Sequence, residues 1–191
     1  MAEVVLFHHV LGLTPGIAEL ASELRRAGHT VHTPDMYEGK TFATLQEGMA
    51  HVQSLGFLAV AQRGVDAVAG LPEDLVYMGY SLGAAPAQKL AQTRPGAMGA
   101  VLIAGCLPSA ELGGPWPASV PLQVHAQEND PEFDNGYDLP VARALVEEAA
   151  DGELFLYPGD KHFFADSSTP DHDPTTTRRL LENVLAFLAR V

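Results

Sequence analysis

The chain has 191 residues, 47% of them hydrophobic, and its 24 acidic against 11 basic residues give a formal charge of −13. This charge repels polyanions, so nucleic acid and anionic membranes are poor candidates for partners. The single cysteine excludes an internal disulfide and suits a reducing compartment. No basic signal-peptide start and no apolar stretch of about 20 residues is present, so we expect one soluble, cytoplasmic domain over residues 1–191.

Strands and helices are expected to alternate along the chain. Short apolar segments closed by Gly, Pro, Asp or Asn predict strands at 4–10, 29–35, 74–80, 100–105, 121–126 and 153–159. Helical patterns lie at 15–28, within 44–69 with a break near Gly56, at 82–92, at 140–150, and from a cap at Asp173 to Val191. The alternation predicts an α/β fold with a mostly parallel sheet of about six strands and helices on both faces. The active site of such a fold lies at the carboxyl ends of the strands.

The stretch VYMGYSLGAAPAQ, residues 76–88, holds the main candidate for a reactive residue. Its Gly-x-Ser-x-Gly pattern places Ser81 between a predicted strand and a predicted helix, which is the context of a nucleophile elbow. Gly79 and Gly83 would keep a strained turn free of side chains, and the Leu82 N–H at the helix start could bind an oxyanion. The alternative is a glycine-flanked turn that binds nothing.

A serine nucleophile needs a base and a carboxylate that orients the base. In elbow hydrolases the acid and then the histidine follow the serine, on loops after later strands. His162 follows the strand at 153–159, and the loop after the strand at 121–126 offers Glu128, Asp130 and Asp134. The residues thus have the expected order, with the choice among the three acids left open.

Other polar residues are expected to be structural. We expect His172 to be a solvated loop residue, His125 a half-buried strand residue, and Cys106 a buried small hydrophobe. A zinc site is disfavoured, because no recognised ligand spacing occurs and strand alternation would point neighbouring histidines to opposite faces. The histidines concerned are His8, His9, His29 and His32.

Five segments occur in a recognisable order: HHVLGLTPG, TPDMYEGKTF, GYSLGA, ENDPEF and GDKHFFAD. Together they resemble the dienelactone hydrolase family of α/β-hydrolases over nearly the whole chain. The resemblance implies Ser81 as nucleophile, Asp130 as the orienting acid and His162 as base. It also implies an oxyanion hole made by the backbone N–H groups of Val10 and Leu82.

Three positions depart from the prototype of that family. Ser81 stands where the prototype has a cysteine, and His9 matches a glutamate that interacts with the resting thiol. Asp166 matches an arginine that helps to hold the carboxylate of the prototype's lactone. A reversed charge at Asp166 would repel an anionic substrate, so a serine-nucleophile variant with a neutral substrate is expected.

The sequence therefore predicts a serine hydrolase that cleaves a small, neutral carboxylic ester or lactone through an acyl-enzyme, without a metal or organic cofactor. The candidate pocket walls are His9, Tyr37, Tyr80, Trp116 and Phe163. Two alternatives remain. One is a small-ligand-binding protein without turnover, and the other is an acyltransferase or amidase that uses the same residues.

Overall fold

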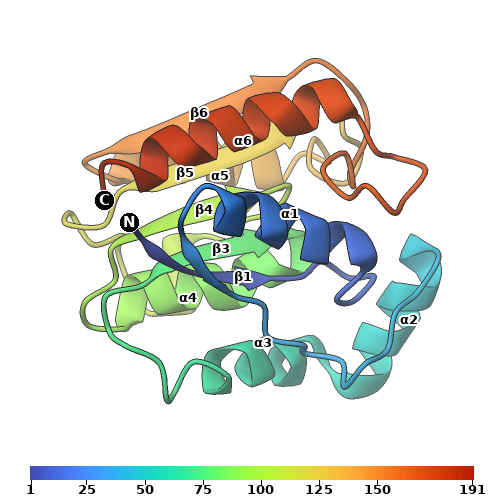
Figure 1. Ribbon diagram of the computed structural model, residues 1–191, viewed down its shortest axis with the longest axis horizontal. Helices are drawn as coiled ribbons and strands as arrows, with labels where there is room; N and C mark the ends of the chain where they lie inside the picture. The colour runs from blue at the N-terminus through green and yellow to red at the C-terminus, as the bar shows by residue number, and fades with distance from the viewer.

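The computed structural model describes residues 1–191 and is built around one six-stranded sheet. All neighbouring strands are parallel, in the order β2-β1-β3-β4-β5-β6 (Figure 1). The strands are β1 (Glu3–Phe7), β2 (Thr30–His32), β3 (Val76–Tyr80), β4 (Gly99–Ile103), β5 (Leu122–Gln127) and β6 (Gly152–Tyr157). The α/β-hydrolase-type sheet expected from the sequence is confirmed.

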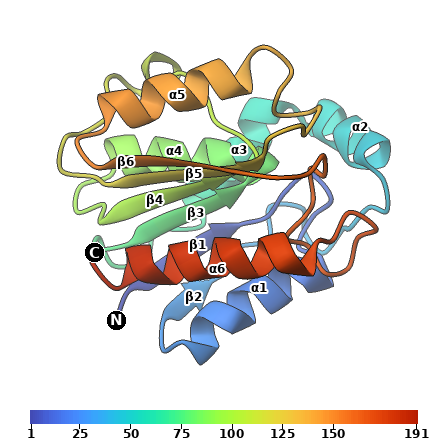
Figure 2. The ribbon, with the colours of Figure 1, turned by 90° about the horizontal axis from the view of Figure 1, so that it is seen from above.

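Helices cover both faces of the sheet, as Figure 2 shows from above. One face packs against α1 (Pro15–Arg26) and α6 (Pro174–Leu188), and the other against α3 (Phe57–Asp66), α4 (Ala84–Thr93) and α5 (Asp138–Glu148). The helix α2 (Leu45–Leu55) precedes α3, and two short 3-10 helices, η1 (Ser81–Gly83) and η2 (Ser109–Leu112), complete the chain. None of these helices combines the length and apolar character needed to cross a bilayer.

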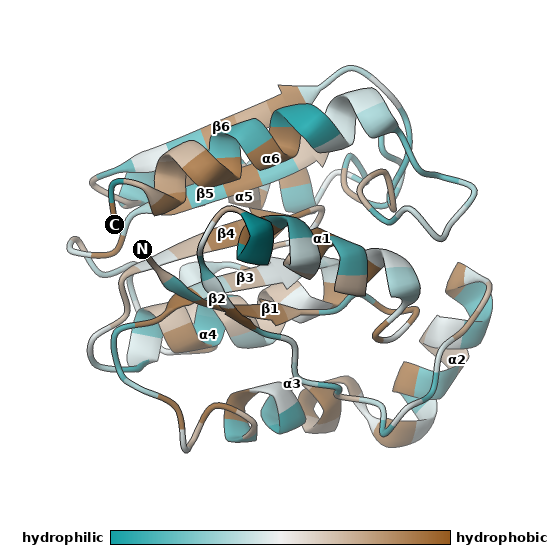
Figure 3. Cartoon of the chain, viewed as in Figure 1, coloured by the Kyte–Doolittle hydropathy of each residue, from teal (hydrophilic) through white to brown (hydrophobic).

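The two hydrophobic cores follow from the alternation of side chains along the strands. In β1, Val5 and Phe7 join the core under α3–α5, whereas Val4 and Leu6 join the core under α1 and α6. The helices α1 and α6 alternate hydrophobic and hydrophilic residues along their length, so each buries one face (Figure 3). Both cores together hold the strand ends in fixed positions.

The first strand is shorter than the sequence suggests, because β1 ends at Phe7 and the chain turns at Val10 and Leu11. The carbonyl of His9 accepts hydrogen bonds from His8 Nδ1, at 2.8 Å, and from the Gly12 N–H, at 3.0 Å. A carbonyl with these two local partners does not extend the strand ladder. This turn contains Val10, one of the two predicted oxyanion donors.

The sheet places the segments after β1 and β3 side by side. The chain leaves β1 for the edge strand β2 and then returns to β3 on the other side of β1. Ligand sites in open parallel sheets lie at such a reversal, beyond the carboxyl ends of the strands. Here the backbone of Gly83 lies so close to the carbonyls of Phe7 and His8 that a Cβ at this position would overlap them.

Candidate active site

Ser81 lies on a sharp turn between β3 and η1. Its φ of 51° falls in the left-handed region, which residues with a side chain rarely adopt. A Cβ on Gly79 would overlap the Gly83 carbonyl, and one on Gly83 would overlap the Phe7 carbonyl. Glycine is therefore required on both sides of the strained serine, as a nucleophile elbow demands.

Pro86 helps to fix the helix behind this turn. It is the third residue of α4, where helix N–H groups have few partners, so its missing donor costs little. Its ring packs against Gly64 of α3, where an added Cβ would come within 2.8 Å of the Pro86 Cβ. The proline thus supports a close contact between α3 and α4 beneath the elbow.

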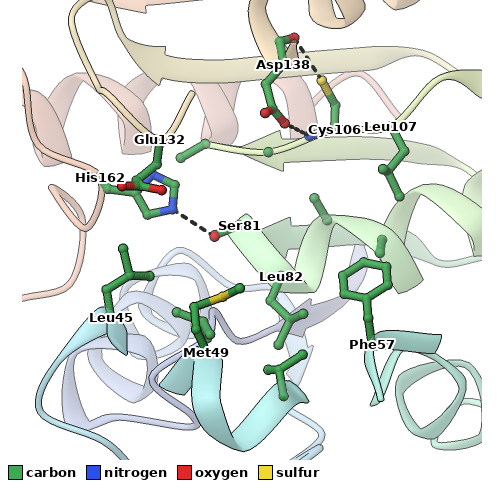
Figure 4. A pocket seen from close by; sticks show the side chains of 16 residues that line it. Leu45, Met49, Phe57, Ser81, Leu82, Cys106, Leu107, Glu132, Asp138 and His162 are labelled. Carbon is green, nitrogen blue, oxygen red and sulfur yellow. Dashed lines mark hydrogen bonds between the residues drawn. The ribbon is translucent and has the colours of Figure 1, made fainter. Parts of the chain in front are cut away.

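Three side chains from separate loops form one chain of hydrogen bonds. His162 Nε2 lies 2.8 Å from Ser81 Oγ, and His162 Nδ1 lies 2.7 Å from Asp130 Oδ2. Figure 4 shows the histidine facing Ser81 across the site. Asp130 is fully buried, and its Oδ1 accepts a hydrogen bond of 2.9 Å from the Glu132 N–H. Among the loop acids, Glu128 and Asp134 are instead exposed to solvent.

The loop that carries His162 is tied to the elbow by Tyr80. The Tyr80 hydroxyl donates to the His162 carbonyl at 2.8 Å and accepts from the Ala165 N–H at 3.2 Å. Burial raises the pKa of Tyr80 well above its usual value, so the hydroxyl keeps its proton. Because Tyr80 directly precedes Ser81, the two residues that must face each other are positioned by one side chain.

Asp166 lies in a buried network and does not face the cavity. Its Oδ2 accepts from His9 Nε2 at 2.7 Å and from the Thr14 hydroxyl at 2.5 Å, while its Oδ1 accepts from the Ser168 N–H and hydroxyl. Burial alone would raise the pKa of Asp166, but the hydrogen bonds from His9, Ser168 and Thr14 outweigh it and lower the pKa to about 2.

This network corrects the argument that Asp166 repels anionic substrates. Asp166 is fully buried, and its carboxylate joins the His162 loop to His9 after β1 and to Thr14, the N-cap of α1. A carboxylate with four hydrogen bonds beneath the site does not contact a substrate. The selection of substrate charge has to come from other residues.

A cavity of about 230 Å³ opens beside Ser81 and is lined mostly by apolar side chains (Figure 4). Val10 and Leu82, the two predicted oxyanion donors, both line it. The other residues around it are Leu45, Met49, Val52, Phe57, Ala84, Ala85, Ala104, Gly105, Cys106, Leu107, Glu132, Asp138 and His162. Two carboxylates and no lysine or arginine thus surround this apolar space.

A second hollow adjoins the first on the side of His162. The two share Leu45, Glu132 and His162, and the second continues past Leu11 and Phe163. Its rim carries polar groups from the loops after β5 and β6, among them Lys161 and Thr169. The site therefore extends from a small apolar cavity at Ser81 to a more polar one beyond the histidine.

Most of the predicted pocket walls lie elsewhere. His9, Tyr37 and Tyr80 are buried beneath the site, and Trp116 packs against Val120, whose carbonyl accepts from the indole N–H at 2.7 Å. None of the four lines the cavity at Ser81. Phe163 lines only the second hollow. The four aromatic side chains pack in the two hydrophobic cores, and His9 is held by its hydrogen bond to Asp166, which the prediction did not anticipate.

The cavity walls that the sequence did not reveal come mainly from α2 and α3. Leu45 and Met49 project from α2, and Phe57 begins α3 (Figure 4). Met49 and Phe57 are each 42% exposed, which is unusual for large hydrophobic side chains on an amphipathic helix. The sequence signal that could have revealed this wall is the presence of apolar residues on α2 and α3 outside the buried faces of these helices.

Cys106 and the histidines near β1 and β2 are the residues considered above for thiol chemistry and for metal binding. Cys106 is buried, and burial raises the pKa of its thiol, which fits a small hydrophobic residue at the cavity wall. The histidines near β1 and β2 turn to different partners, His8 toward Met36 and His9 toward Asp166. No group of three or more His, Cys, Asp or Glu side chains is arranged to hold a metal ion.

The chain has a parallel sheet, a strained elbow at Ser81, and Asp130 and His162 on loops at the carboxyl ends of the strands. These features define a protein of the α/β-hydrolase class. The chain belongs to the dienelactone hydrolase family, whose model it matches over residues 1–191. No curated protein matches the sequence.

Solved structures share this fold. A dienelactone hydrolase-like promiscuous phosphotriesterase from metagenomic libraries is 19% identical, with a TM-score of 0.76, over 100% of this chain and 86% of its own. Dienelactone hydrolase from Anabaena variabilis is also 19% identical, with a TM-score of 0.64 and coverages of 99% and 86%. A thioesterase domain from the curacin biosynthetic pathway is 14% identical, with a TM-score of 0.65 and coverages of 97% and 90%.

Proposed function

We propose that the protein hydrolyses small carboxylic esters or lactones through an acyl-enzyme on Ser81. The observation that carries this proposal is the continuous chain of hydrogen bonds from Ser81 Oγ through His162 to the buried Asp130. A hydroxyl that can pass its proton to a neutral imidazole becomes an effective nucleophile, and the carboxylate stabilises the imidazolium that forms. Membership of a family of α/β-fold hydrolases supports the same chemistry.

Each proton and bond in this reaction has a place in the site. Ser81 Oγ attacks the carbonyl carbon while His162 Nε2 takes the serine proton, and the N–H groups of Val10 and Leu82 bind the oxyanion. His162 then returns the proton to the leaving oxygen as the bond between carbonyl carbon and leaving oxygen breaks. Water attacks the acyl-enzyme by the same route, which releases the acid and restores Ser81.

The substrate is expected to have an uncharged, apolar acyl group. The small cavity at Ser81 suits such a group, and the acidic residues in its wall are Glu132 and Asp138. These carboxylates disfavour an anionic acyl group, so they replace Asp166 as the physical reason for a neutral substrate. The leaving group, which takes its proton from His162, would lie in the second hollow beside Phe163 and Thr169.

Labelling with a fluorophosphonate probe tests this proposal. Wild-type protein is expected to form a covalent adduct at Ser81, detected by mass spectrometry of the digested protein, and to hydrolyse p-nitrophenyl esters. The Ser81→Ala variant should do neither, while Ser109→Ala, which removes a serine on η2 outside the cavity, should behave like wild type. A wild-type protein that neither labels nor turns over esters would favour the ligand-binding alternative.

The length of the acyl chain gives a second prediction. Each additional CH₂ buried in an apolar cavity contributes about 0.8 kcal/mol, so kcat/KM for p-nitrophenyl esters should rise about 4-fold per CH₂ until the cavity is full. Ala85→Leu would place a larger side chain in the cavity wall and should move the optimum to a shorter chain. Ala50→Leu, on the exposed side of α2, is the matched control and should leave the optimum unchanged. An optimum that stays in place in Ala85→Leu would place the acyl group elsewhere.

A further inference from the structure

The peptide that joins His9 to Val10 has an unusual pattern of hydrogen bonds. The Val10 carbonyl accepts from the Tyr37 hydroxyl, the Leu11 N–H donates to His9 Nδ1, and the Leu11 carbonyl accepts from Phe42. The His9 carbonyl accepts two hydrogen bonds. The Val10 N–H has no hydrogen-bond partner, although Val10 is only 2% exposed. The N–H groups of the buried His8 and His9 also have none, but of these three residues only Val10 lines the cavity. Unpaired N–H groups in buried backbone are rare, and this one belongs to a residue of the cavity wall, where a ligand can pair with it.

His8 is one of the two groups that fix this peptide. Its ring is fully buried, and Nδ1 lies 2.8 Å from the His9 carbonyl oxygen. On its other side, Nε2 accepts a hydrogen bond of 3.0 Å from the Met36 N–H. A carbonyl can only accept and a backbone N–H can only donate, so the ring must be neutral with its proton on Nδ1. Burial, the largest influence, lowers the pKa of His8 to about 4, which keeps this form at neutral pH.

The geometry of the peptide bond connects His8 to the reaction. In a trans peptide the C=O and N–H point in opposite directions within one plane. A donor that holds the His9 carbonyl on the side of β2 therefore turns the Val10 N–H toward the cavity, which Val10 lines beside Ser81 and Leu82. We infer that His8 is a positioning residue for the oxyanion hole: its Nδ1–H sets the plane of the peptide that presents the Val10 N–H to the transition state. This inference rests on the proposed ester hydrolysis.

The surrounding contacts show why the side chain of His8 is needed. The other donor to the His9 carbonyl is the Gly12 N–H, which lies within the same short turn and does not connect this carbonyl to another part of the fold. His8 instead links the carbonyl to Met36, in the segment after β2, which packs against α3 through Gly64. The ring thus braces the oxyanion turn against a different part of the fold.

Replacement of His8 by asparagine and by leucine separates the hydrogen bond from the packing. Asparagine carries an amide nitrogen where histidine has Nδ1, so it can still donate to the His9 carbonyl, whereas leucine has the same branched shape without a donor. Both variants lose the acceptor for the Met36 N–H. We expect His8→Leu to lower kcat for p-nitrophenyl esters about 10²-fold with KM nearly unchanged, as for a misplaced oxyanion donor. His8→Asn should stay within a few-fold of wild type.

Two further measurements distinguish positioning from a general loss of structure. The inhibition constant of a trifluoromethyl ketone, whose adduct with Ser81 carries an oxyanion, should rise in His8→Leu in parallel with the fall in kcat/KM. The control is His125→Leu, which removes another fully buried histidine, in β5 and outside the cavity. It should keep wild-type kcat, whatever it does to stability. Should His8→Leu fail to fold, His8→Gln takes its place. The glutamine amide lies one bond further from the backbone than Nδ1 does, so its donor is displaced from the His9 carbonyl and kcat should fall.

The outcomes are separable from those of the proposed function. A wild-type protein without hydrolysis or labelling would overturn ester hydrolysis, and the oxyanion role of His8 with it. An active wild type with unchanged kcat in His8→Leu or His8→Gln would overturn the role of His8 alone. Equal losses of kcat in His8→Asn and His8→Leu would show that the donor at Nδ1 is not what matters.

Discussion

Replacing Asp130 with asparagine is expected to lower kcat for ester hydrolysis about 10⁴-fold. The asparagine amide can occupy the same space, but it can donate a hydrogen bond to His162 Nδ1. The ring proton would then lie on Nε2, the atom 2.8 Å from Ser81 Oγ, and His162 could no longer accept the serine proton. Ground-state binding should change little, so the loss should appear in kcat and leave KM almost constant.

The same loop supplies the control for this prediction. Asp134 is exposed four residues further on, and Asp134→Asn should keep kcat within about twofold of wild type, since surface charges have small effects at a distance. Stopped-flow or plate measurements of p-nitrophenyl ester hydrolysis, together with the rate of fluorophosphonate labelling, provide the comparison. A larger loss of kcat in Asp134→Asn than in Asp130→Asn would show that Asp130 is not the orienting carboxylate.

The sequence was informative where short motifs fix the backbone. The glycines around Ser81 predict the elbow because only glycine fits at those positions, and the structure places a positive φ at Ser81 between them. The order of serine, acid and histidine predicts convergence, since loops after parallel strands meet at one edge. The structure accordingly brings His162 and Asp130 to Ser81. The choice of Asp130 over its neighbours came from the family resemblance, not from spacing.

The sequence was less informative about side chains whose direction depends on tertiary packing. Tyr37 follows β2 and Tyr80 ends β3, as residues of a pocket wall would, but their hydroxyls bond to backbone carbonyls beneath the site. The cavity wall depends instead on how α2 and α3 lie over the strand ends, and no local pattern specifies that placement. The matching of Asp166 to an arginine in the family prototype suggested a contact with substrate. Its four hydrogen bonds inside the protein became visible only when β1, α1 and the histidine loop were placed together.

We expect buried histidines to determine how the free energy of unfolding changes below about pH 6.5. His8, His9 and His125 are all fully buried. Burial is the largest cause of a lowered pKa in each, and it lowers the pKa of His8 to about 4 and that of His125 to about 3. Above the pKa of about 6.5 that histidine has in an unfolded chain, these residues are neutral in both states and do not affect the pH dependence. Below it, the unfolded state binds protons first, so the free energy of unfolding falls as the pH falls.

The magnitude of this effect makes acid unfolding the expected outcome. His8 and His125 each contribute a slope that approaches about 1.4 kcal/mol per pH unit, or about 2 kcal/mol between pH 6.5 and 4.5, against the roughly 5–15 kcal/mol typical of a whole domain. Asp166 acts in a separate window, because its pKa of about 2 means that its stabilisation is lost only as the pH falls below about 4.

Urea unfolding followed by circular dichroism at pH 7.5, 6.0 and 5.0 measures the slope. In His125→Leu it should be smaller by about 1.4 kcal/mol per pH unit between pH 6 and 5, the contribution of one proton, even if the variant is less stable throughout. His172→Gln, which replaces a loop histidine that keeps contact with solvent, is the matched control and should retain the wild-type slope. A wild-type slope near zero in this range would mean that the buried rings are protonated in the folded protein. Neutral His8 could not then be the form that holds the oxyanion peptide, so the same titration also tests a premise of its positioning role.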